Sequence, residues 1–209
     1  MHLMYKKRKI IFDLDETLYA DSSLRQRREQ AILEFLGDKS EVYLELKKSK
    51  GTIASLNEMG ISKEVFYNII EKVEINLKKD KKLRKMIKNL KKKFEVIVLS
   101  NVSKNLVKET LEKIGIIDLI DNYYGADCFS QQKPSVECFF MVERGDVCIG
   151  NNYEKDLEVP KSRGAITILI GKDDKRSDFC GKSIYDIERV IQNIGGIRRY
   201  LELRTTVFS

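Results

Sequence analysis

The chain has 209 residues, of which 42% are hydrophobic and 34% are charged, and its formal net charge is +7. This length supports one substantial core, or a core with a small inserted module, and the composition excludes a disordered chain. No apolar stretch approaches the length of a membrane span, so we expect no membrane partner.

The N-terminal segment and the cysteines indicate the cellular compartment. Basic residues 6–9 lead into a short apolar run that Asp13 and Asp15 interrupt, unlike a secretory signal. The four cysteines stand singly, without a C-x-x-C pair, so neither a zinc site nor a disulfide framework is indicated. Together these features predict a cytoplasmic protein with reduced thiols.

Residues 10–14 are a continuous apolar run with a carboxylate near its end, which is typical of a parallel strand buried on both faces. Asp13 and Asp15 are two residues apart and point to the same side if the strand ends there. In phosphoryl transfer, one carboxylate can attack while the other protonates the leaving oxygen. An exposed turn is the alternative, but a buried strand that ends in two acids favours a magnesium ion or a cationic side chain as their partner.

Residues 20–79 contain no convincing strand, only helical patterns separated by single glycines. A helical block inserted after the first strand is expected to lie over the carboxyl ends of the strands. We therefore predict an α/β core formed by residues 1–19 and 80–209, with a helical cap formed by residues 20–79. Tyr43 and Tyr67 in this cap can stack on a base, and apolar packing is the alternative.

The densest basic run is residues 78–93. Its apolar residues recur at helical spacing (Leu83, Met86, Ile87 and Leu90), which predicts an amphipathic surface helix with a solvated lysine face. No aromatic or glycine-rich RNA motif accompanies the run, so we expect no nucleic-acid partner. The alternative, nucleic-acid binding, rests on net charge alone and predicts a steep dependence of affinity on salt.

Three later apolar runs, residues 94–99, 147–150 and 166–170, resemble the first and are expected to be buried strands. Helical patterns separate them, such as residues 105–114, which Gly115 closes as a C-terminal cap. The alternation of strands and helices predicts the α/β class with a doubly wound parallel sheet.

Polar side chains follow the expected strands at residues 94–99 and 147–150. Ser100 and Asn101 can donate hydrogen bonds to a phosphoryl oxygen, and an ordinary helix cap is the alternative. Lys133, in a Lys-Pro pair, can hold a phosphate and the charge of a nucleophile together, and a simple turn is the alternative. Asp156 and the oxygen of Asn151 can complete the shell of a hard cation.

These four elements, in this order and at strand ends, resemble the haloacid dehalogenase-type (HAD) phosphohydrolase superfamily over about residues 9–170. The resemblance implies an HAD-like Rossmannoid core with a helical cap, and a magnesium-dependent phosphatase that acts on a small phosphorylated metabolite. It implies that Asp13 is the nucleophile, which forms an aspartyl-phosphate, and that Asp15 is the general acid and then the general base. Lys133 would stabilise the negative charge of the nucleophile and of the phosphate.

The resemblance also implies the ligands of the phosphate and of the metal ion. The phosphate-binding residues would be Thr17, Ser100, Asn101 and Lys133. The ligands of Mg²⁺ would be Asp13, Asp15 through its carbonyl, Asn151 and Asp156. Three further segments, residues 17–19, 50–56 and 82–84, are more loosely similar to the pyrimidine 5′-nucleotidase-like branch, which makes nucleotides a candidate substrate class. Nothing in the sequence indicates an oligomeric state.

One departure from the family pattern concerns the metal. The last motif usually opens with Gly-Asp, whereas this chain has Gly150-Asn151, so the site loses one negative charge and should bind the cation less tightly. The alternative function is therefore a weak or silent protein that binds a phosphorylated ligand or a protein partner. A carbon–halogen hydrolase is a third alternative, but Asp15 argues against it because a leaving halide needs no proton donor.

Overall fold

The computed structural model describes residues 7–192, so the C-terminal tail at residues 195–209 lies outside the described residues. The chain divides into two compact units. The first consists of Met1–Ala20 and Lys79–Ser209, and the second is Asp21–Lys78.

A six-stranded parallel sheet forms the centre of the first unit, with the strand order β3-β2-β1-β4-β5-β6. The strands are β1 (Arg8–Phe12), β2 (Phe94–Leu99), β3 (Asn122–Tyr124), β4 (Val147–Gly150), β5 (Ile166–Ile170) and β6 (Phe179–Gly181). The predicted doubly wound α/β fold is confirmed, and β2, β4 and β5 have the predicted bounds. The strand predicted at residues 10–14 begins and ends two residues earlier, because Arg8 and Lys9 pair with β2 despite their charges.

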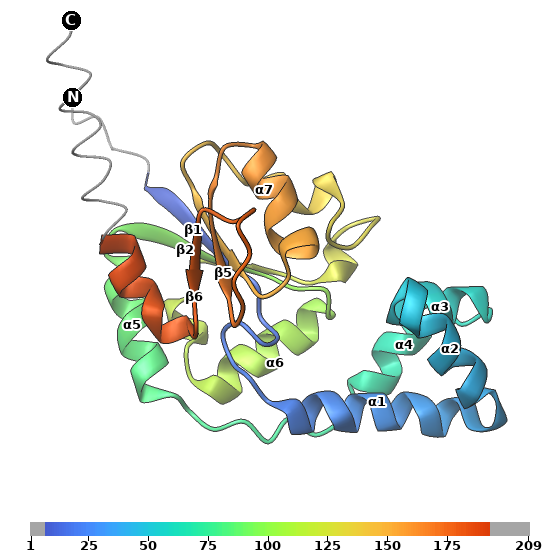
Figure 1. Ribbon diagram of the computed structural model, residues 1–209. Helices are drawn as coiled ribbons and strands as arrows, with labels where there is room; N and C mark the ends of the chain where they lie inside the picture. Colours follow the sequence, from blue (N-terminus) through green and yellow to red (C-terminus); the bar gives the residue numbers. More distant parts are fainter. Residues whose placement is uncertain (1–6, 193–209) are drawn as a thin grey trace, which may run out of the picture. The chain divides into compact units, whose positions relative to one another are not determined.

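Helices cover both faces of the sheet. They are α5 (Lys81–Lys91), α6 (Lys104–Ile114) and α7 (Glu158–Ser162). The connections β1 to β2 and β2 to β3 run in one direction across the sheet and β4 to β5 runs in the other. Right-handed crossovers therefore place α5 and α6 on one face and α7 on the opposite face (Figure 1).

The ends of these helices follow local capping rules. The Asp80 carboxylate accepts a hydrogen bond from the amide of Leu83 at 2.8 Å, so α5 begins at Lys81 and not at residue 78. Gly115, at φ 79°, ends α6 in the left-handed conformation that glycine adopts readily, as predicted. The apolar face of α5 is buried and most of its lysines are exposed, so the predicted amphipathic helix is confirmed.

Short helical turns complete the fold. They are η1 (Gly37–Lys39), η2 (Ile117–Leu119), η3 (Ala126–Cys128), η4 (Val136–Phe139), η6 (Ile184–Asp186) and the π-helical turn η5 (Tyr153–Leu157). The last of these follows β4 directly and brings Asp156 to the end of the sheet.

Regular structure in the second unit is helical throughout its described residues. It comprises α1 (Ser22–Leu36), η1, α2 (Ser40–Lys50), α3 (Thr52–Glu58) and α4 (Lys63–Ile70). Tyr43 and Tyr67 are buried, which favours the apolar-packing interpretation of these rings. The role of this unit as a cap stays a prediction.

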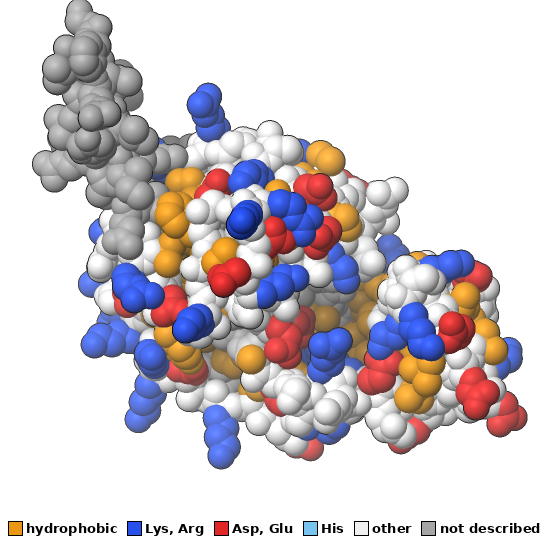
Figure 2. All heavy atoms as spheres, viewed as in Figure 1, with side chains coloured by type: hydrophobic (Ala, Val, Ile, Leu, Met, Phe, Trp, Pro, Cys, Tyr) orange, Lys and Arg blue, Asp and Glu red, His pale blue; other side chains and the backbone are white. Residues whose placement is uncertain are grey.

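Charged side chains of both signs share the surface. On the face seen in Figure 2, lysines and arginines lie among aspartates and glutamates. Ion pairs between exposed side chains, such as Arg84 with Asp118 at 2.6 Å, join charges of opposite sign on the surface. Within residues 7–192, no helix has the length and apolar character needed to cross a membrane.

Candidate active site

The candidate site lies at the carboxyl ends of β2, β1 and β4, three neighbouring strands. The direction of the connections reverses between β1 and β4, and open α/β sheets bind ligands at such a point. The amide of Asp13 donates to the carbonyl of Ile149 at 2.8 Å, which continues the ladder between β1 and β4. The amide of Ser100 donates to the carbonyl of Tyr124 at 3.0 Å. Backbone hydrogen bonds therefore hold both residues at the same edge of the sheet.

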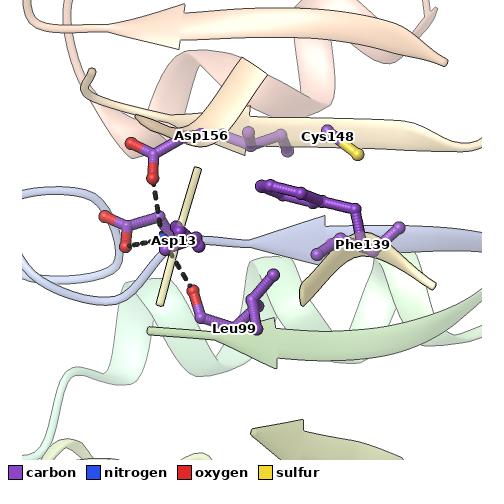
Figure 3. Close-up of a pocket in the computed structure, with 8 residues that line it drawn as sticks. Asp13, Leu99, Phe139, Cys148 and Asp156 are labelled. Carbon is purple, nitrogen blue, oxygen red and sulfur yellow. Dashed lines mark hydrogen bonds and ion pairs between the residues drawn. The ribbon is translucent and has the colours of Figure 1, made fainter. Parts of the chain in front are cut away.

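Lys133 joins two of the predicted site residues. Its Nζ lies 2.7 Å from Oδ1 of Asp13 and 2.7 Å from Oδ1 of Asp156, and it donates to the carbonyl of Leu99 at 3.0 Å. Figure 3 shows the Asp156 carboxylate and the Leu99 carbonyl directed towards one point beside Asp13. The Lys133 side chain is only 3% exposed, so these contacts satisfy a buried ammonium.

The backbone of Lys133 is held by Asn101. The Asn101 Oδ1 accepts from the amide of Lys133 at 2.9 Å, and its Nδ2 donates to the Lys133 carbonyl at 3.1 Å. The peptide bond between Lys133 and Pro134 is cis. The side chain of Asn101 therefore positions the lysine, a role that sequence reasoning missed, and its predicted contact with phosphate stays a prediction.

The backbone of the loop that carries Asp156 orients its carboxylate. Its Oδ2 accepts a hydrogen bond from the amide of Asn152 at 3.0 Å, so both carboxylate oxygens have donors. A Cβ on Gly150 would lie 2.4 Å from the Cβ of Asp156, so only glycine allows this approach. The glycine that opens the last motif is thus required by the packing of the acid that ends it.

Hydroxyl groups bind the two acids of the first motif. Thr17 Oγ1 donates to Oδ2 of Asp13 at 2.9 Å. Ser100 Oγ donates to Oδ2 of Asp15 at 3.3 Å, and the Tyr19 hydroxyl donates to Oδ1 of the same carboxylate. Hydrogen bonds thus join Thr17, Asp13, Lys133 and Asp156 in one group. Asp15 and Ser100 form a second hydrogen-bonded pair, held at the same edge of the sheet. Sequence reasoning missed Tyr19 as a partner of Asp15, although a short loop can bring together two residues that are four positions apart.

A small pocket is lined on one side by the charged group and on the other by apolar side chains. Ile11, Phe139 and Cys148 line it together with Asp13 and Lys133. Figure 3 shows the Phe139 ring and the Cys148 thiol on the side away from the carboxylates. Burial raises the pKa of the Cys148 thiol, so it packs as a neutral group.

The charges of the site are not balanced by Lys133 alone. Burial raises the pKa of Asp13 to about 7, and the charge of Asp156 adds to this effect, while Lys133 opposes it. Burial lowers the pKa of Lys133, but the charges of Asp13 and Asp156 outweigh burial and hold that pKa above its usual range. A second cation beside Asp13 would therefore favour its ionised form, which is the form that attacks phosphorus.

The donor atoms present fit Mg²⁺ with few protein ligands. Within residues 7–192, no three acidic, histidine or cysteine side chains form a metal-binding cluster. Mg²⁺ commonly uses one or two carboxylates and keeps water or substrate oxygens for the rest of its shell. The Asp13 carboxylate, the Asp15 carbonyl and the Asn151 oxygen are hard donors of this kind. Asp156 bonds to Lys133, so its role as a direct ligand stays a prediction.

Two of the three segments that carry the looser nucleotidase similarity have structural contacts outside the site, whereas residues 17–19 contact its two acids. Arg84, in residues 82–84, donates to the carbonyl of Gly115 and pairs with Asp118 at 2.6 Å on the surface. Ser55, in residues 50–56, donates to the carbonyl of Gly51 within its own helix start. These contacts explain the two segments without a substrate.

Solved structures share this fold at low sequence identity. The HAD-hydrolase YfnB from Bacillus subtilis, bound to magnesium, has 14% identity and a TM-score of 0.62 over 90% of this chain and 99% of its own. An HAD phosphatase from Thermococcus onnurineus has 16% identity and a TM-score of 0.65 over 88% of this chain and 97% of its own. The 2-haloacid dehalogenase from Pseudomonas syringae pv. Tomato DC3000 has 16% identity and a TM-score of 0.59 over 90% of this chain and 99% of its own.

The sequence itself provides the family assignment. No curated protein matches the chain. The profile described as haloacid dehalogenase-like hydrolase matches residues 10–144, which is more than half of the chain. This match agrees with the strand order and with the acids at the end of β1, and the chain therefore belongs to the haloacid dehalogenase-like hydrolase family.

Proposed function

We propose that the chain is a magnesium-dependent phosphohydrolase that acts on a small phosphorylated metabolite through an aspartyl-phosphate on Asp13. The observation that carries this proposal is the buried ammonium of Lys133, 2.7 Å from the carboxylates of both Asp13 and Asp156. Such a group can neutralise a nucleophile and a bound phosphate at the same time. The phosphatase from Thermococcus onnurineus with the same fold adds support.

In the proposed reaction, a carboxylate oxygen of Asp13 attacks phosphorus as the bond to the leaving oxygen breaks. Asp15 gives its proton to that oxygen, and Lys133 balances the charge of the phosphoryl group. Water then attacks the aspartyl-phosphate, Asp15 takes the proton of this water, and Asp13 is regenerated. Mg²⁺, held by Asp13, the Asp15 carbonyl and Asn151, would supply charge neutralisation.

We also propose that the helical unit at residues 21–78 acts as a cap and selects the substrate, with nucleotides as a candidate class. The proposal places the protein in the cytoplasm. The four cysteines are free, which supports a reducing compartment.

The test is hydrolysis of 4-nitrophenyl phosphate with Mg²⁺ by the wild type and by Asp13→Asn. We expect the variant to lose at least about a hundredfold in kcat, because no nucleophile remains. Asp118→Asn, which changes a surface carboxylate, is the control and should keep the wild-type rate. Equal rates in the wild type and in Asp13→Asn would refute the covalent mechanism.

Asn151 favours a second candidate, a weak or silent protein that binds a phosphorylated ligand. Asn151→Asp should raise both the rate and the affinity for Mg²⁺ if the neutral amide limits the site. Asn152→Asp is the matched control, because it adds the same charge one residue later, where Asn152 caps η5 and Asp is an equally good cap. Unchanged rate and metal affinity in Asn151→Asp would show that the amide is sufficient.

A further inference from the structure

We propose that Tyr19 is a positioning residue for the acid of this reaction: its hydroxyl holds one oxygen of the Asp15 carboxyl and thereby directs the other towards the leaving group. The inference rests on the proposed function and adds a residue to it.

The contact is made within one tight loop. The Tyr19 hydroxyl donates to Oδ1 of Asp15, and the two residues also form an isolated β-bridge. Between them, Glu16 adopts a φ of 58°, and the amide of Leu18 donates to the carbonyl of Leu14 at 3.0 Å. These bonds hold the backbone, so the tyrosine ring and the carboxyl meet in a fixed geometry.

Ser100 also donates to this carboxyl, at 3.3 Å to Oδ2. A hydroxyl has a single proton to donate. In the proposed reaction the Ser100 hydroxyl donates its hydrogen bond to a phosphoryl oxygen. Its hydrogen bond to Asp15 is then lost. The proposed reaction gives the Tyr19 hydroxyl no phosphate contact, so its bond to Oδ1 would keep the orientation of the carboxyl.

The orientation of the Asp15 carboxyl has to be fixed by a contact because the terminal torsion of an aspartate varies over a broad range. A general acid has to place its proton within hydrogen-bond reach of the leaving oxygen. With Oδ1 held by Tyr19, Oδ2 is the oxygen that carries the proton. The proton moves from Oδ2 to the leaving oxygen as the bond from that oxygen to phosphorus breaks, and Tyr19 keeps its own proton.

The test measures kcat/KM for a series of substituted phenyl phosphates whose leaving phenols differ in pKa. Tyr19→Phe keeps the ring and removes the hydroxyl. Tyr185→Phe is the matched control, because its hydroxyl also donates to a carboxylate, that of Asp80, outside the site. Thermal melting of each variant checks that it is folded.

We expect Tyr19→Phe to lose about tenfold or more on phenyl phosphate, whose leaving group needs the proton, and less than about threefold on 4-nitrophenyl phosphate. In an Asp15→Asn background the same change should have no further effect, because the acid is already absent. The control should match the wild type throughout the series.

Three results would overturn the inference: wild-type rates in Tyr19→Phe, an equal loss for every leaving group, or a further loss in the Asp15→Asn background. Failure of the proposed function is seen separately, as wild-type hydrolysis that does not depend on Asp13, and it would overturn the role of Tyr19 as well.

Discussion

Lys133 is the residue on which the charge balance of the site depends. It contacts β2 through Leu99, the end of β1 through Asp13 and the loop after β4 through Asp156. Removal of one partner from a buried ion pair costs far more than the pair contributes, because a charge is left without compensation.

We predict that Lys133→Met lowers the free energy of unfolding by about 3–5 kcal/mol, because two buried carboxylates lose their cation. Urea denaturation at neutral pH, without added metal, measures this change. Lys91→Met is the control: Lys91 also donates to one carboxylate and one carbonyl, those of Asp121 and Leu119, but its side chain is 34% exposed. It should cost no more than about 1 kcal/mol. Similar losses in the two variants would contradict this prediction.

The start of α5 shows how one carboxylate connects two elements. Asp80 accepts from the amide of Leu83 at 2.8 Å and from the hydroxyl of Tyr185, which lies in η6. Burial raises the pKa of Asp80, but the Tyr185 hydroxyl and the backbone amides outweigh burial and hold that pKa below its usual 3.8. The ionised form is therefore favoured by folding.

We predict that Asp80→Ala costs about 1 kcal/mol at pH 7 through loss of the helix cap, whereas Asp80→Asn, which keeps a capping oxygen, costs less. Because the pKa is lower in the folded state, the benefit of the charge is present above the ordinary pKa of 3.8 and is lost as the pH falls through the folded value. The difference in unfolding free energy between wild type and Asp80→Asn should therefore shrink below about pH 3.8. A difference that grows at low pH would contradict the cap assignment.

At the level of the whole chain, the two compact units each bury their own apolar residues. Leu56 in α3 and Leu111 in α6 are both almost fully buried, at 1% and 0% exposure, and they belong to different units. A cavity-forming substitution in the core of one unit is therefore expected to destabilise that unit and not the other.

We predict that Leu56→Ala and Leu111→Ala each cost about 2–5 kcal/mol through the cavity that they create. In native-state hydrogen exchange, Leu56→Ala should lower the protection of amides in α1 to α4 and leave β1 and β2 unchanged, and Leu111→Ala should do the reverse. The two variants are controls for each other. Loss of protection throughout the chain in both would mean that the units unfold as one.

The two short strands β3 and β6 show the limit of prediction from the sequence. Each has three residues, too few to show the long apolar run of a central strand, and both lie at the edges of the sheet. The strands with long apolar runs were predicted, since burial on both faces selects apolar residues at every position. Edge strands lack that requirement, and their pairing depends on neighbours distant in the sequence.

The local pattern of this sequence decided the alternation of strands and helices, the caps at Asp80 and Gly115, and the acids at the end of the first strand, because each depends on residues a few positions apart. Tertiary structure decided which of those groups meet. Lys133 reaches Asp13 across 120 positions, and Asn101 reaches the backbone of Lys133 across 32. Such partners are set by the order of strands in the sheet, which no local periodicity encodes.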